Sequence, residues 1–131
     1  MRTKASTPKG WSLKMVGDLA EFRNGSAFNV DDWSDAGVPI VRIQNLNGSF
    51  QYNHYRGDME SCVMVEPGDL LFSWSGNRGT SFGPFLWNGP RGVLNQHIFK
   101  VTPKPGLETD FVFHLLRNIT SRIEGRAHGG T

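Results

Sequence analysis

The hydrophobic pattern of this 131-residue chain changes period once, close to residue 109. Before that point the apolar residues come in short runs interrupted by Gly, Pro or Asn, which favours short β-strands joined by turns. After it, apolar residues recur at the spacing of one helical face: Val112, Leu115, Leu116, Ile119 and Ile123. The pattern therefore predicts an α+β fold, with a curled, mainly antiparallel β-sheet and an amphipathic helix near the C-terminus.

The ends of this helix also have sequence signals. Thr109 or Asp110 is suited to cap its start, and Gly125 is placed to end it. We therefore expect residues 126–131 (RAHGGT) to form a glycine-rich loop.

Four segments have clear strand or turn signals. Residues 38–46 (VPIVRIQNL) predict one strand, and the Asn-Gly pair after it favours a hairpin turn. Residues 66–69 (EPGD) suit a type II turn, which we expect to join the two strands of a hairpin. Residues 80–87 and 93–101 predict further strands, with His97 in the middle of the last one. The aromatic residues of this region are expected in the core: Trp74, Phe82, Phe85 and Trp87.

Charge is distributed unevenly along the chain. Nine of the twelve acids lie in residues 18–69, mostly in segments that resemble solvated turns. Residues 70–107 contain no acid, and their cations are Arg78, Arg91, Lys100 and Lys104. A surface built from this window would suit a polyanion, and the alternative is chance in a loop-rich segment.

Motifs for catalysis are missing from the sequence. SWSGN has a glycine on only one side of Ser75, unlike the G-x-S-x-G of a serine hydrolase, and GNRGTS lacks the lysine of a P-loop. With one cysteine, no internal disulfide can form. No metal site is indicated, because the histidines are scattered singly: His54, His97, His114 and His128.

No signal directs the chain to a membrane. No apolar run approaches the roughly 18 residues of a membrane span. The polar start, MRTKASTPKG, lacks the apolar core of a signal peptide. We therefore expect a cytoplasmic location.

Residue types that recognise DNA lie beside the predicted turns. Asn and Gln can pair with adenine and Arg with guanine, and short hydroxyls suit phosphate. Gln44 and Asn45 could equally tie their loop to the scaffold. The candidates for DNA contact at this stage are Arg42, Gln44, Asn45, Tyr52, Arg56, Asn77, Arg78, Thr80 and Ser81.

Several blocks together resemble a known family. GDLAEFRNG, GVPIVRIQNL, GDLLFSWSGNRGTSFGPFLWNGPRGVLNQHIFKV and RAHGGT occur in this order. They resemble the target recognition domain of type I restriction-modification specificity (S) subunits, over residues 11–131. GDLLFSWSG and NQHIFKV are the most specific blocks.

The resemblance implies a non-catalytic domain that recognises one half of a bipartite double-stranded DNA target. In that family an S subunit carries two such domains, separated by long helices that pair as a coiled coil. Methyltransferase subunits methylate adenine with S-adenosylmethionine, and restriction subunits use ATP to translocate and cut DNA. No cofactor is therefore expected on this chain, whereas S-adenosylmethionine, ATP and Mg²⁺ are expected on partner subunits.

In the family, the bases are recognised by loops that differ between members. The corresponding segments here are residues 45–56, 75–81 and 126–131. The resemblance thereby adds four candidates for DNA contact: Asn47, Ser75, Arg126 and His128.

The expected domain organisation is simple. Residues 1–10 form a flexible basic arm, and residues 11–131 form a single recognition domain without spacer helices or a second domain. Such a chain would be a fragment of a longer subunit or a natural half-length subunit, which would need to dimerise to present two half-sites.

Two other functions compete with DNA recognition. The first is a protein-interaction module that docks a methyltransferase subunit or acts as a half-length regulatory subunit. The second is a cryptic nuclease or methyltransferase, which the absent motifs disfavour.

The sequence predicts opposite outcomes for two substitutions. Arg78→Ala should weaken DNA binding while the free energy of unfolding changes by less than about 0.5 kcal/mol, as at an exposed site. Trp74→Ala should destabilise the domain by roughly 3–5 kcal/mol if its ring is buried. Thermal unfolding and DNA titration of both variants would test this, and the reverse outcomes would invert the assignment of core and surface.

Overall fold

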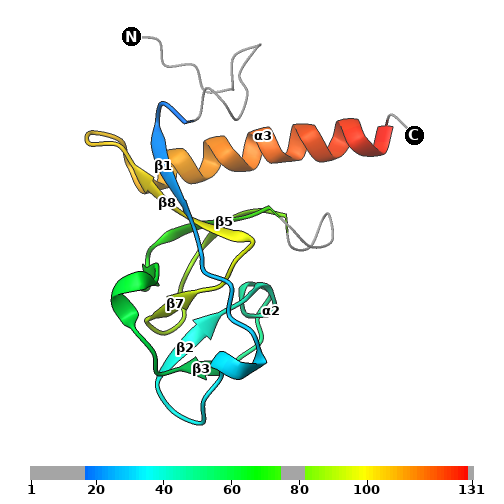
Figure 1. Ribbon diagram of the computed structural model, residues 1–131. Helices are drawn as coiled ribbons and strands as arrows, with labels where there is room; N and C mark the ends of the chain where they lie inside the picture. The colour runs from blue at the N-terminus through cyan, green and yellow to red at the C-terminus, as the bar shows by residue number, and fades with distance from the viewer. Residues whose placement is uncertain (1–16, 75–81, 130–131) are drawn as a thin grey trace.

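The computed structural model describes residues 17–74 and 82–129, with residues 123–129 described as helix backbone only. These residues form two four-stranded sheets and a long C-terminal helix. Helix α3 lies at one end of the molecule, and α2, β2 and β3 lie at the other (Figure 1). The α+β class and the mainly antiparallel pairing are thus confirmed, but the strands form two sheets instead of one.

The first sheet has the strand order β1-β8-β5-β6, and its neighbours are all antiparallel. Helix α3 packs on it through the predicted apolar face, because Val112, Leu115, Leu116 and Ile119 are buried in one cluster with residues of β5 and β8. The elements are β1 (Ala20–Asn24), β5 (Leu70–Ser73), β6 (Gly83–Leu86), β8 (Ile98–Pro103) and α3 (Thr109–Gly129).

The second sheet has the order β3-β2-β7-β4 and contains the parallel pair β2–β7. Its strands are short: β2 (Val38–Val41), β3 (Asn53–Tyr55), β4 (Met64–Val65) and β7 (Gly92–Leu94). Single helical turns connect them, namely η1 (Val30–Asp32), α2 (Ile43–Leu46) and η2 (Met59–Ser61).

One apolar layer joins the two sheets. Leu71 of β5 and Ile98 of β8 pack in the same buried cluster as Val41 of β2, Val65 of β4 and Leu94 of β7. The chain crosses between the sheets where β1 ends. There the Gly25 N–H donates to the Ile98 carbonyl over 2.9 Å, and a Cβ at Gly25 would collide with the Asn95 backbone. The close approach therefore requires glycine at this position.

The strand predicted over residues 93–101 is interrupted, so that prediction is wrong. It divides into β7 and β8, which belong to different sheets. His97 stands between them with a φ of 74°, a conformation that is uncommon outside glycine. Its carbonyl accepts from the Trp74 N–H over 3.2 Å, so the turn is held from the first sheet.

The turn at residues 66–69 is confirmed, but the hairpin around it is wrong. Gly68 has a φ of 96°, and the Asp69 N–H donates to the Glu66 carbonyl over 3.0 Å. The strands on either side do not pair with each other, because β4 lies in the second sheet and β5 in the first. The turn is thus a crossing between sheets.

The predicted end of the last helix is also wrong. Helix α3 continues through Gly125 to Gly129, so residues 126–129 are helical instead of a loop. A glycine inside a helix costs only about 1 kcal/mol relative to alanine. Glu124, Arg126 and Ala127 around it are good helix formers and outweigh that cost.

The two central tryptophans differ in burial. Trp87 is buried, with 5% of its surface exposed, and its indole N–H donates to the Pro90 carbonyl over 2.8 Å. Trp74 is 40% exposed, so its assignment to the core is wrong. It directly follows the last residue of β5 and lies against His97 and Phe99, and its indole N–H donates to Asn24 Oδ1 over 3.3 Å.

This difference replaces the earlier expectation for Trp74. Trp87→Ala should lower the free energy of unfolding by about 3–5 kcal/mol, because it leaves a cavity between the sheets. Trp74→Ala, as the matched control, should cost clearly less. Chemical denaturation of both variants measures this, and an equal loss for the two would contradict the burial described here.

Candidate nucleic-acid interface

The loop from Arg42 to Asn53 is organised by one buried amide. Asn45 is 5% exposed, and its Oδ1 accepts from the Arg42 N–H over 2.9 Å. Its Nδ2 donates to the carbonyls of Ser49 and Gln51 over 3.1 and 3.0 Å. These bonds bend the chain into α2, which explains why the predicted strand over residues 38–46 ends at Val41. Asn45 therefore ties the loop to the scaffold.

Arg42 is held at the surface at the start of the same loop. Its Nη1 donates to Asn53 Oδ1 over 2.9 Å, and its guanidinium lies 5.4 Å from the centre of the Trp33 ring. Both contacts fix the plane of the guanidinium, which is the group that pairs bidentately with guanine or phosphate. The sequence did not suggest that Asn53 or Trp33 would contact Arg42. These residues meet only after folding, so no local motif marks them.

The exposed side chains of this loop are polar amides and one phenyl ring. Gln44, Asn47 and Gln51 are exposed, and Phe50 is 87% exposed. Tyr52 is half-buried and packs against the layer between the sheets. Phe50 was not a candidate for DNA contact from the sequence, because its exposure depends on how the loop folds.

The other sequence candidates divide into three groups. Arg56 is exposed just beyond β3, at the far end of that strand from Asn53. Arg126 and His128 lie in the backbone of α3, and their side chains are outside the described residues. Five others also lie outside the described residues: Ser75, Asn77, Arg78, Thr80 and Ser81.

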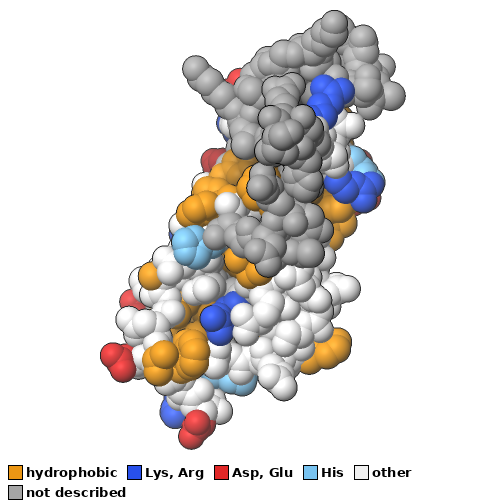
Figure 2. All heavy atoms as spheres, turned by 90° about the vertical axis from the view of Figure 1, so that its right-hand side faces the viewer, with side chains coloured by type: hydrophobic (Ala, Val, Ile, Leu, Met, Phe, Trp, Pro, Cys, Tyr) orange, Lys and Arg blue, Asp and Glu red, His pale blue; other side chains and the backbone are white. Residues whose placement is uncertain are grey.

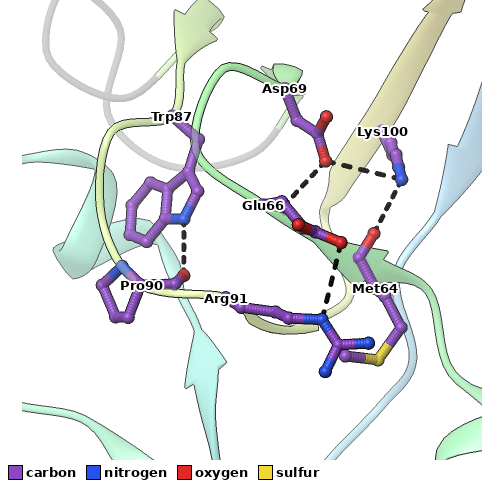
Figure 3. A network of polar contacts seen from close by, with 7 residues as sticks. All are labelled: Met64, Glu66, Asp69, Trp87, Pro90, Arg91 and Lys100. Carbon is purple, nitrogen blue, oxygen red and sulfur yellow. Dashed lines mark hydrogen bonds and ion pairs between the residues drawn. The ribbon is translucent and has the colours of Figure 1, made fainter.

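Two cations of the acid-free segment, residues 70–107, pair with acids in the folded domain. Figure 3 shows that Lys100 of β8 contacts Asp69 and the Met64 carbonyl, at 3.4 and 2.8 Å. Arg91 pairs with Glu66 over 3.5 Å. The acids precede the window in sequence but fold against it, so these two cations serve the crossing between the sheets.

The face that carries α2 has few acids near its middle. Figure 2 views the right-hand side of Figure 1, where α2 lies. On the described surface of this view, the acidic side chains lie near the margins, and the middle of the lower half combines uncharged polar surface with Lys or Arg. The acids of η1 and η2 also cap their own turns: Asp32 accepts from Asn29 N–H and Asp58 from Glu60 N–H, each over 3.0 Å.

Tyr55 and Cys62 lie next to each other beside the second sheet. Partial burial, followed by the neighbouring Cys62 thiol, raises the pKa of the Tyr55 hydroxyl above its ordinary value, so this group stays neutral at neutral pH. Cys62 itself is buried at the end of η2. Within the described part of the chain, no three His, Cys, Asp or Glu side chains gather closely enough to hold a metal ion.

A family model identifies the family of the chain. Residues 8–131 match the model described as type I restriction modification DNA specificity domain. The chain belongs to this family. The specificity domain thus has DNA sequence recognition as its family role, in agreement with a surface of guanidinium and amide groups.

Two proteins illustrate the similarity. The specificity domain is 24% identical over 124 residues to the type I restriction enzyme EcoBI specificity subunit of Escherichia coli, a match that covers 92% of this chain and 25% of that protein. Its fold matches the crystal structure of the HsdS subunit from Thermoanaerobacter tengcongensis with a TM-score of 0.62 and 15% identity, over 93% of this chain and 31% of that one. The chain therefore spans about a quarter of the curated relative.

Among the described residues, no helix combines the length and apolar character needed to cross a bilayer.

Asn45 and Gln44 are neighbours, but only Asn45 is buried, so replacing each one tests which side chain holds the loop. Asn45→Ala removes three internal hydrogen bonds and should lower the free energy of unfolding by about 2–3 kcal/mol, since each is worth roughly 1 kcal/mol. Gln44→Ala changes an exposed side chain and should stay within about 0.5 kcal/mol. Urea denaturation distinguishes them, and equal values would show that the amide does not organise the loop.

Proposed function

We propose that this specificity domain recognises one half of a bipartite double-stranded DNA target. The observation that carries the proposal is the loop held by Asn45, which carries the half-buried guanidinium of Arg42, bonded to Asn53, and the exposed side chains of Gln44 and Asn47. These are the groups that contact guanine and adenine edges in the major groove. A fixed loop also loses little conformational entropy on binding.

The proposal extends to a division of labour between chains. The domain itself catalyses nothing, and it acts in the cytoplasm with methyltransferase and restriction subunits. Those subunits hold S-adenosylmethionine, ATP and Mg²⁺ and supply adenine methylation and DNA cleavage. A second domain of the same kind, on the same polypeptide or on another copy, recognises the other half of the target. The family match supports this assignment.

The proposal predicts a sequence preference and a steep dependence on salt. The full chain, incubated with a randomised duplex library, should enrich one short motif. Affinity for that duplex should fall as salt rises, with a slope in log–log form of about 0.9 for each phosphate neutralised. Fluorescence anisotropy with the enriched and scrambled duplexes measures both quantities.

A matched pair of variants makes the test specific to the loop. Gln44→Ala combined with Asn47→Ala should reduce the ratio between specific and scrambled affinity, since each lost base contact is worth about 1–3 kcal/mol. Gln96→Ala, which alters a half-buried amide of the β7–β8 connection, should leave the ratio unchanged. Enrichment of no motif, alone and with a methyltransferase subunit present, would refute sequence recognition.

A further inference from the structure

Phe50 is exposed to solvent on the loop between α2 and β3. Its side chain is 87% exposed, more than Val30 at 69% or Phe111 at 51%. A phenyl ring that stays exposed does not contribute the stabilisation that it would give if it were buried. A single exposed apolar residue is common on protein surfaces, so exposure alone shows nothing about function.

The backbone on both sides of Phe50 is fixed. The two carbonyls that flank it, Ser49 and Gln51, both accept from the buried amide of Asn45. The Gln51 N–H also donates to Ser49 Oγ over 3.1 Å, and the Ser49 N–H donates to the Gln44 carbonyl over 3.0 Å. The backbone on both sides of Phe50 is therefore held by hydrogen bonds while its ring stays exposed, so the exposure of Phe50 is built into the fold.

The ring stands beside a hollow of about 520 Å³ between this loop and the turn after β6. Aromatic and aliphatic walls include Phe50, Tyr52, Leu86 and Trp87, and amides come from Asn47 and Asn88. The described residues that line the hollow include no Lys, Arg, His, Asp or Glu. A phosphate would need a cation there, whereas a base edge needs amides and apolar contact.

We propose that Phe50 contacts the C5-methyl group of a thymine in the DNA target, with the ring reaching into the major groove. Apolar side chains contact thymine through this methyl group, and Asn pairs with adenine through its amide. The hollow that joins Phe50 to Asn47 and Asn88 thus suits an A·T pair or adjacent A·T pairs. This inference rests on the proposed function, because it names which bases the same surface recognises.

The test replaces thymine with uracil, which removes only the methyl group. The motif enriched by the full chain is resynthesised with uracil at each thymine in turn. For the wild type, one such change should weaken binding about four-fold, the effect expected for one buried methyl group. Phe50→Ala should bind the thymine and uracil duplexes equally at that position, while Phe50→Leu should keep part of the difference.

The matched control is Phe111→Ala, which removes another exposed phenylalanine, on α3. It should preserve the full difference between thymine and uracil. Thermal unfolding of Phe50→Ala should match the wild type, because the ring is exposed and the loop is held by Asn45. A variant that unfolded early would instead show that the ring supports the fold, and would overturn the proposal.

The remaining outcomes separate this inference from the function on which it rests. If the wild type enriches no motif, both fail. If it enriches a motif in which no uracil substitution matters, or Phe50→Ala keeps the full difference, the thymine contact alone fails. If Phe50→Ala weakens only the binding of a methyltransferase subunit, the ring is a protein-docking residue and the thymine contact is again refuted.

Discussion

The structure depends on the apolar layer between its two sheets. Leu71 and Ile98 of the first sheet meet Val41, Val65 and Leu94 of the second, and Trp87 closes the layer. None of the strands of the second sheet exceeds four residues, and sheets that small need a second apolar surface to be stable. The first sheet supplies that surface on one side and binds α3 on the other.

The loops of the domain follow from this arrangement. Because the chain crosses repeatedly between the sheets, its connections are held by contacts across the boundary: Lys100 of β8 donates to the Met64 carbonyl of β4, and Gly25 approaches the β7–β8 connection. Cations that seemed free in the sequence are used in this way. In the loop around α2, by contrast, Asn45 holds the backbone and the side chains of Gln44 and Gln51 are exposed.

This division bears on how a recognition domain can change its target. The hydrogen bonds of Asn45 reach backbone groups of Arg42, Ser49 and Gln51, so they do not depend on the side chains that face outward. Exposed positions such as Gln44 and Phe50 can therefore change without loss of the hydrogen bonds of Asn45. The bonds that hold the loop and the side chains proposed to contact DNA thus belong to separate atoms of one short segment.

The sequence by itself determined the α+β class, the buried face of α3 and the turn at Gly68, because helical period and positive φ are local properties. It also determined the family, because the blocks and their order can be recognised in the sequence without the structure. Only the tertiary structure decided that the strands form two sheets, that Trp87 is buried and Trp74 exposed, and that Asn45 organises the loop from which Phe50 projects. Each of these depends on segments that meet only after folding, and a strand of three or four residues does not encode in its own pattern which sheet it joins.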